Sequence, residues 1–418
     1  MAALGGGGSA SGAPAAEASP TLPTVTAPRP TSVSVPDFYR PPSPLPPGPS
    51  GSLLRAERVT GVPTVPRHAR VWRILYRSRT VAGQDVAVSG YVVAPAGAAP
   101  VGGYRVIDWT HGTTGMAAPC GPSLFTNLDG QSLYLTPYLD QFLAADDVIV
   151  ATDYEGLGAG GIHPYLVGAS AAMNSLDAVR AAAKLPGLRL SPDVVVIGHS
   201  QGGQAALFTG EIAPSYSPDL RLLGVVAIAP ATNISAAITA ADYLTSRGGI
   251  SDNQGDLDYV AMALWAWTHT YRALTVTSVF TPVGASDMKA ADSGCLPQIA
   301  ASLLRARARQ LFRSGAVNSP AVQHDATLNN PGQVHTAAPI LVVQGTDDPI
   351  VPYALTEFFV RSQACAVGDR VSLTLYPGVG HGGVIPPARH EILSYVADRF
   401  AGRAAPSGCL PGANPPAP

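Results

Sequence analysis

The sequence predicts an α/β protein built on one mostly parallel β-sheet with helices on both faces. Short apolar stretches alternate with helical stretches along most of the chain. Some of the apolar stretches, such as 194–197, do not alternate with polar residues, as is typical of strands covered on both faces. The interval 231–334 contains helical stretches and no clear strand, which indicates a helical insertion in the sheet protein.

The order of the expected elements supports this architecture. The expected strands are 69–78, 85–94, 105–109, 147–152, 193–197, 222–229, 339–344 and 371–376. The expected helices are 133–144, 168–185, 201–211, 236–247, 257–270, 296–313 and 388–400. The first two strands flank a turn around Gly83 and form a hairpin, which adds antiparallel strands at one edge of the parallel sheet.

Five segments follow from this pattern. We expect a disordered tail and Pro-rich arm over 1–50, a first part of the core over 51–230 and a helical lid over 231–334. The core resumes over 335–410 and a short tail covers 411–418. The first segment is rich in Ala, Gly, Ser, Pro and Thr, a composition that cannot bury a core.

Composition excludes several classes of function. Only 13% of the 418 residues are charged and the net charge is −2, so no basic face for nucleic acid is expected. No apolar run is long enough to cross a membrane. The chain has no Cys/His cluster with the spacing of a metal site, and we expect neither a metal nor an organic cofactor.

The segment Gly198-His199-Ser200-Gln201-Gly202 indicates a nucleophilic serine. It has the pattern G-x-S-x-G and lies between an apolar strand and an Ala-rich helix, which is the context that this motif requires. The glycines leave room for a sharp turn, and the following helix directs its N-terminal N–H groups toward the serine. We therefore predict Ser200 as the nucleophile of an α/β-hydrolase.

Two loops after late strands supply candidates for the other catalytic groups. In this fold the acid and the base follow the serine in the order Ser, Asp or Glu, His. Asp348 lies third after Gly345 and is the predicted orienting carboxylate, with Asp347 as the alternative. His381 stands in a Gly-rich loop after the last strand and is the predicted base.

Acyl transfer also needs two N–H donors for the oxyanion. One is expected from Gln201, which follows the nucleophile. The other is expected from the loop His111-Gly112-Thr113-Thr114-Gly115 after the third strand, with Thr113 as the predicted donor and Thr114 as the alternative.

Taken together, these segments resemble the fungal lipase A-like family of secreted lipases, which has bacterial members. The resemblance runs from about Phe38 to Cys409. It is carried by the segments 37–39, 75–78, 88–90, 111–115 and 153–158, the Ser200 turn and the two late loops. The resemblance implies ester hydrolysis by Ser200, His381 and Asp348, with a helical lid that shapes an acyl pocket. The sequence of the 111–115 loop is closer to that of ordinary esterases.

The cysteines suit either two disulfides in an exported protein or four buried thiols, and sequence alone allows three pairings. The resemblance implies the pairs Cys120–Cys295, between core and lid, and Cys365–Cys409, at the C-terminus. It also implies a secreted protein, although the first 30 residues lack the basic start and apolar stretch of a signal peptide.

The predicted function is that of a serine carboxylic-ester hydrolase, a lipase or esterase acting on acyl esters such as glycerides through an acyl-enzyme. The alternatives are an acyltransferase, or an esterase for short acyl chains or polyesters, with the same three residues. We expect a monomer whose lid contacts a lipid–water interface. The apolar stretch 257–267 predicts either an acyl-chain surface or the buried face of a lid helix.

Overall fold

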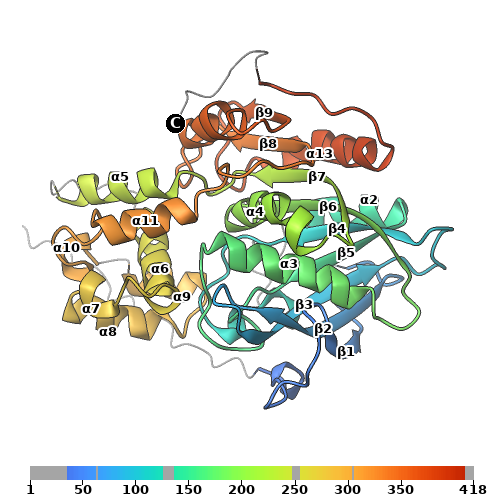
Figure 1. Cartoon of the computed structure of the whole chain (residues 1–418), viewed down its shortest axis with the longest axis horizontal. Helices are drawn as coiled ribbons and strands as arrows, with labels where there is room; N and C mark the ends of the chain where they lie inside the picture. The colour runs from blue at the N-terminus through green and yellow to red at the C-terminus, as the bar shows by residue number, and fades with distance from the viewer. Residues whose placement is uncertain (1–34, 63–64, 126–135, 247–254, 304–305, 410–418) are drawn as a thin grey trace, which may run out of the picture.

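A nine-stranded sheet forms the centre of the computed structural model, which describes residues 35–62, 65–125, 136–246, 255–303 and 306–409 (Figure 1). The strands are β1 (Leu53–Val59), β2 (Arg70–Arg79), β3 (Asp85–Ala94), β4 (Tyr104–Thr110), β5 (Asp147–Thr152), β6 (Leu190–His199), β7 (Arg221–Ile228), β8 (Ile340–Gly345) and β9 (Val371–Tyr376). Their order in the sheet is β1-β2-β3-β5-β4-β6-β7-β8-β9. The strands from β4 to β9 are parallel, and β1 to β3 form an antiparallel edge. This confirms the predicted fold class.

Helices cover both faces of the sheet. They are α2 (Thr136–Ala144), α3 (Gly168–Ala182), α4 (Gln201–Tyr216), α12 (Tyr353–Phe358), the π-helical turn η4 (Phe359–Ala364) and α13 (Ile385–Phe400). Along β4, Ile107 belongs to the core formed with α2 and α13, whereas the adjacent Val106 packs in the core formed with α3. Because neighbouring strand residues point to opposite faces, burial on both sides explains the continuous apolar runs.

The interval between β7 and β8 forms a separate group of helices. These are α5 (Ile234–Ser246), α6 (Gly255–Thr270), α7 (Val276–Val279), α8 (Pro282–Ala291), α9 (Leu296–Leu303), α10 (Ala308–Leu311) and α11 (Pro320–Leu328). We call this group the helical insertion. It lies beyond one end of the sheet (Figure 1) and has its own core, in which Trp267 and Phe280 are fully buried. None of the described helices is long and apolar enough to cross a membrane.

The prediction of one helix in the insertion is wrong. The sequence predicted a single helix over 296–313, but α9 ends at Leu303 and α10 begins at Ala308. Arg307, before α10, has an extended backbone with φ −111° and ψ 142°. The chain turns here because it returns to α7 and α8: Arg313 donates its N–H to the carbonyl of Val279, and Phe312 pairs with Phe280.

Other differences concern element ends and short elements. The helix after Ser200 continues to Tyr216 rather than ending near 211, and the last helix begins at Ile385 rather than 388. Strand β1 and helices α7, α8 and α11 were not predicted. The expected surface arm is anchored by Tyr39, which is fully buried and hydrogen-bonds Ser123. Residues 1–34 of the expected tail and arm, and residues 410–418, lie outside the described residues.

Both disulfides form as the resemblance implied. Cys120 bonds Cys295 of the helical insertion, and Cys365 bonds Cys409 near the C-terminus. The first bond joins the loop after β4 to the segment before α9, which are 175 residues apart in the chain. It therefore attaches the insertion to the sheet domain at a third point, besides the two chain connections.

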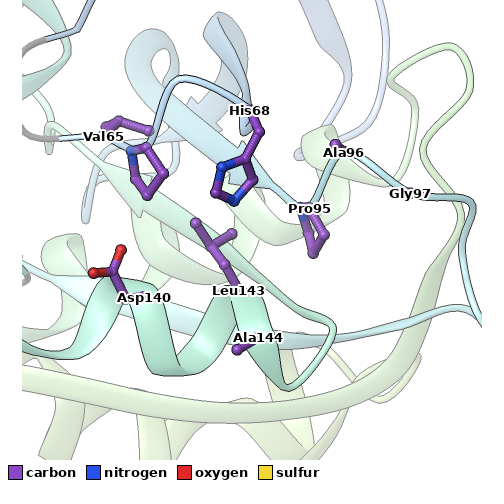
Figure 2. Close-up of a pocket in the computed structure, with 9 residues that line it drawn as sticks. Val65, His68, Pro95, Ala96, Gly97, Asp140, Leu143 and Ala144 are labelled. Carbon is purple, nitrogen blue, oxygen red and sulfur yellow. The ribbon is translucent and has the colours of Figure 1, made fainter.

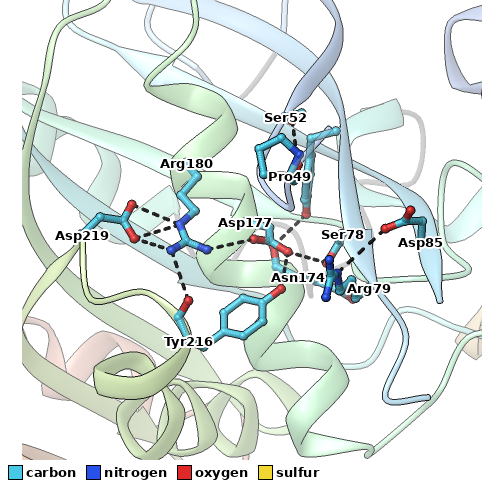
Figure 3. Close-up of polar contacts among 11 residues, drawn as sticks. Pro49, Ser52, Ser78, Arg79, Asp85, Asn174, Asp177, Arg180, Tyr216 and Asp219 are labelled. Carbon is cyan, nitrogen blue, oxygen red and sulfur yellow. Dashed lines mark hydrogen bonds and ion pairs between the residues drawn. The ribbon is translucent and has the colours of Figure 1, made fainter. Parts of the chain in front are cut away.

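A buried carboxylate joins α3 to the antiparallel edge of the sheet (Figure 3). Asp177 accepts hydrogen bonds from Ser78 of β2 and from Tyr216 at the end of α4, both at 2.8 Å. Arg180 lies beside it and pairs with Asp219. Burial raises the pKa of Asp177 to about 6, although these hydrogen bonds and Arg180 lower it. The network fixes α3 and α4, which flank the Ser200 turn.

The buried Asp108 of β4 is predicted to make stability depend on pH. Burial raises its pKa to about 7, and the hydrogen bond from Ser175 lowers it less. In the unfolded chain the pKa of an Asp is ~3.9. Between this pKa and the raised pKa of the folded state, the folded protein keeps a proton on Asp108 that the unfolded chain has lost. The stability of the fold therefore falls as the pH rises through this range. Asp108→Asn should therefore gain stability at pH 8, by at most about 4 kcal/mol, and little at pH 4. Urea unfolding at several pH values measures this; a gain independent of pH would contradict it.

Candidate active site

The turn at Ser200 forces an L-residue into an unusual backbone conformation. Ser200 follows β6, precedes α4, and has φ 60° and ψ −119°. A Cβ at Gly198 would lie 2.0 Å from the carbonyl oxygen of Gly202, and one at Gly202 would lie 2.0 Å from that of Thr110. Both positions therefore require glycine. Backbone strain of this kind persists where the surrounding structure holds it, and it often marks a functional residue.

The Ser200 turn is held by hydrogen bonds to neighbouring strands. Ser200 donates its N–H to the carbonyl of Ile228 at the end of β7 (2.9 Å), and its own carbonyl accepts from Ala231 (3.2 Å). The hydroxyl of Thr110 donates to the carbonyl of Gly202 (2.8 Å). Ser200 is 8% exposed and lines a cavity at the carboxyl ends of the strands.

Asp348 and His381 meet at the same edge of the sheet, in the loops after β8 and β9. His381 Nδ1 lies 2.7 Å from Asp348 Oδ2. Because a carboxylate only accepts, Nδ1 carries the proton, and the Nε2 of a neutral ring is left as a base. The carbonyl of His381 lies 3.2 Å from Nε2 of His199, the residue before Ser200, and the centroids of the two imidazoles are 4.6 Å apart with the rings tilted by 49°. The structure thus brings His381 and Asp348 together, beside the residue that precedes Ser200.

The surroundings of Asp348 favour its charged form. Its other oxygen accepts the N–H groups of Ile350 (2.9 Å) and Val351 (2.8 Å), and Gln344 donates to Oδ2 (2.8 Å). Burial raises the pKa of Asp348, but the hydrogen bond and charge of His381 and the two N–H groups outweigh it, and the net pKa lies below the ordinary value. The alternative, Asp347, is exposed and hydrogen-bonds its neighbour Thr346.

Gln344 is a site residue that the sequence reasoning missed. Its amide donates to Asp348, and its oxygen accepts the hydroxyl of Thr356 in α12 (3.0 Å). A signal was present, because Gln344 is a polar residue at the end of the apolar run of β8 and is fully buried. Buried polar side chains are normally hydrogen-bonded, so such a residue predicts a nearby partner.

The predicted oxyanion donors lie in two neighbouring segments. Thr113 stands in the 111–115 loop, which follows β4, and β4 pairs with β6. The hydroxyl of Thr113 contacts the hydroxyl of Tyr165 (2.8 Å). The side-chain amide of Gln201 lies 3.0 Å from Nε2 of His163, whose Nδ1 donates to the carbonyl of Glu155. Burial lowers the pKa of His163 to about 3, so the ring is neutral and its Nε2 accepts from Gln201.

An apolar cavity of about 320 Å³ opens at Ser200. It lies between the helical insertion and the loops of the sheet, and its walls are mainly small or aliphatic side chains. Helix α5 supplies Ala236, Ala237 and Ala240, helix α6 supplies Tyr259, Val260 and Ala263, and α12 with the preceding loop supplies Ile350, Val351, Pro352, Ala354 and Leu355. Most of the apolar stretch 257–267 is buried core, and one part of it lines this cavity.

A larger hollow of about 770 Å³ lies elsewhere (Figure 2). It is lined by residues around His68, Gly97 and Asp140. The end of β3 and the end of α2 meet there, at the amino ends of the parallel strands, which is the edge opposite Ser200. Because none of the predicted site residues reaches it, this hollow is separate from the candidate active site.

The fold and the turn after β6 place the chain among the α/β-hydrolases. Residues 134–408 match the secretory lipase family, so the chain belongs to that family and is a carboxylic ester hydrolase. Its secretory family and its two disulfides agree with an extracellular location.

Two of the relatives are named as secreted lipases. Two secreted triacylglycerol lipases of Malassezia globosa are 25% and 24% identical to the chain, over 65% and 89% of its length. The first match spans only 57% of that relative, and the second spans 82%. A protein of Mycobacterium tuberculosis named as a probable inactive lipase is 26% identical over 48% of the chain.

Solved structures share the fold. Candida antarctica lipase A in its closed state superimposes with a TM-score of 0.75 at 20% identity, covering 91% of this chain and 89% of that one. A rice cell wall degrading esterase of Xanthomonas oryzae gives a TM-score of 0.67 at 20% identity, covering 85% and 99%. The similarity extends over nearly the whole of both structures, so the helical insertion is included in the shared architecture.

The glycines of the Ser200 turn generate a stability prediction. Gly202→Ala should destabilise the fold by about 3 kcal/mol, because its Cβ would displace the backbone of Thr110 and overpacking on this scale costs ~1–3 kcal/mol or more. Gly97→Ala is the matched control, since a Cβ there meets nothing within 4 Å. Urea unfolding followed by tryptophan fluorescence compares them, and equal stabilities of the two variants would show that the turn is not tightly packed.

Proposed function

We propose that the chain hydrolyses acyl esters through Ser200, His381 and Asp348 by way of an acyl-enzyme. The observation that carries the proposal is the strained Ser200, at the mouth of an apolar cavity and at the same sheet edge as the hydrogen-bonded pair His381–Asp348. A hydroxyl becomes a nucleophile at neutral pH when a base removes its proton and a carboxylate orients that base. These three groups provide that arrangement.

The reaction proceeds in two halves. The Oγ of Ser200 attacks the ester carbonyl carbon while His381 Nε2 takes the hydroxyl proton. The tetrahedral intermediate collapses, the alcohol leaves with the proton from His381, and the acyl group stays on Ser200. Water then attacks the acyl-enzyme, with His381 again acting as base, and the carboxylic acid is released. Asp348 stays charged and stabilises the imidazolium.

The oxyanion of each intermediate is stabilised by the N–H groups of Gln201 and Thr113. Gln201 is the first residue of α4, where the helix dipole also favours negative charge. Its side chain is held by the neutral His163, which limits the freedom of this residue. Fixed donors aimed at the developing charge are usually the largest contribution to catalysis of this type.

The substrate is an ester with an apolar acyl chain. The cavity at Ser200 is lined by Ala, Ile, Val and Leu side chains, which suit a hydrocarbon chain and not a charged group. The helical insertion supplies one wall and acts as the lid. Tyr353 and Phe358 of α12 expose large apolar side chains beside the cavity-lining Pro352 and Leu355, and they support contact with a lipid–water interface. The monomeric state remains a prediction.

Removal of the nucleophile tests the proposal. Ser200→Ala keeps the Cβ and the backbone of the turn, so it should fold like the wild type, with the same circular dichroism and thermal midpoint. Its kcat on a p-nitrophenyl ester should fall by about 10⁵–10⁶-fold, as in other serine hydrolases that lose their nucleophile. Substantial activity in the folded variant would exclude Ser200 as the nucleophile.

The shape of the cavity predicts acyl-chain selectivity. Ala237 of α5 lines it, and Ala237→Phe should lower kcat/KM for octanoyl esters at least ten-fold more than for acetyl esters, because the ring occupies space that the longer chain needs. Thr239→Phe is the control, since Thr239 lies on the same helix but is exposed and outside the cavity. Equal losses for both esters in Ala237→Phe would place the acyl chain elsewhere.

A further inference from the structure

The 111–115 loop is bound directly to the helical insertion. Leu296 of α9 donates its N–H to the carbonyl of Thr114 (2.8 Å), and Met116 donates to the carbonyl of Gly294 (3.2 Å). Between these bonds, Gly115 and Cys295 form an antiparallel bridge. The disulfide of Cys295 with Cys120 lies at the same point. We call the segment 294–296 with this disulfide the clamp.

The clamp and the loop are packed without free space. A Cβ at Gly115 would lie 2.5 Å from the Cα of Cys295 and 2.7 Å from the Sγ of Cys120. Both cysteines are buried, and they pack with Leu157 in a small apolar cluster. Because Gly115 also has a φ of +146°, this position accepts glycine alone. A shift of the segment 294–296 would therefore move the loop with it.

The start of the same loop is fixed by the sheet domain. The hydroxyl of Tyr154 donates to the carbonyl of His111 (3.0 Å), and the imidazole of His111 contacts the carbonyls of Gly112 (2.6 Å) and Asp153 (3.3 Å). Thr113 thus stands between a start that is held by the core and an end that is held by the helical insertion. Its neighbour Thr114 makes the hydrogen bond to the clamp.

We propose that the clamp positions the backbone N–H of Thr113 for catalysis, which makes Cys120 and Cys295 positioning residues for turnover as well as cross-links. This inference rests on the proposed function, in which that N–H binds the oxyanion. An oxyanion donor contributes fully when it is held within about 0.5 Å of its working position. The helical insertion then has two roles, because it lines the acyl cavity and also holds one donor in place.

The second disulfide provides a matched control. Cys365–Cys409 joins the end of the α12–η4 segment to the C-terminal chain, where Gly408 donates to the carbonyl of Val371 in the edge strand β9. Among the described residues, this disulfide makes no contact with the 111–115 loop. Removing it should lower stability through the unfolded chain, as removing any disulfide does, without moving Thr113.

The test compares Cys120→Ser/Cys295→Ser with Cys365→Ser/Cys409→Ser, well below the melting temperatures of both. Activity on p-nitrophenyl acetate is expressed per active site, counted by titration to completion with a fluorescent phosphonate. The first variant should lose about ten-fold or more in kcat with KM within about two-fold, a loss smaller than the ~10²–10³-fold expected for a deleted donor. Its affinity for a trifluoromethyl ketone, which mimics the tetrahedral intermediate, should weaken by the same factor as kcat/KM. The control variant should keep kcat within two-fold.

A clamp variant with wild-type kcat and wild-type affinity for the ketone would overturn the inference. If that variant does not fold, Leu296→Pro with the disulfide intact takes its place, because it removes the N–H that bonds Thr114 and proline is tolerated at the first position of a helix. It should show the same split between kcat and KM, and a folded Leu296→Pro with wild-type kcat would equally overturn the inference. Ser200→Ala separates the two levels of failure. An active Ser200→Ala contradicts the proposed function itself, whereas an inactive Ser200→Ala beside fully active clamp variants contradicts the clamp alone.

Discussion

The strained backbone at Ser200 is the constraint on which the rest of the site depends. The φ of 60° at Ser200 is tolerated because Gly198 and Gly202 let β6, α4 and the end of β4 approach within contact distance. The hydroxyl of Thr110 bonds the same turn. This close approach brings the loop after β4 beside the serine, so the turn that exposes the nucleophile also places the candidate oxyanion loop. The parallel sheet supplies the remaining groups, because the loops after β8 and β9 end at the same edge.

In the proposed mechanism, the helical insertion connects substrate binding with catalysis. Its helices α5 and α6 form walls of the cavity at Ser200, while the segment before α9 is bonded to the 111–115 loop. One segment of the chain therefore lines the cavity at Ser200 and also holds the loop of a proposed oxyanion donor. In the proposed mechanism, α5 or α6 moves to admit substrate while the segment 294–296 stays fixed by its disulfide.

Sequence patterns predicted the elements whose signals are local. The apolar runs of β5 and β9 predicted the first and last residues of these strands, and the G-x-S-x-G pattern predicted the turn at Ser200. Strand β1 was missed because it is mostly exposed at the sheet edge and forms by pairing with β2, which leaves no apolar alternation. The break between α9 and α10 arises from tertiary pairing of Phe312 with Phe280, which helix propensity does not register. The partners of Asp348 and of the 111–115 loop likewise come from distant segments, so only the chemistry of the site was predictable, not its supports.

In the proposed mechanism, Ser200 is the one residue that becomes acylated. The most direct measurement is mass spectrometry of the protein after reaction with an alkyl fluorophosphonate, followed by proteolysis and sequencing of the labelled peptide. We expect one label per chain on Ser200 and a loss of ester hydrolysis in proportion to labelling. A label on another residue, or full hydrolysis by a protein whose Ser200 is labelled, would contradict it.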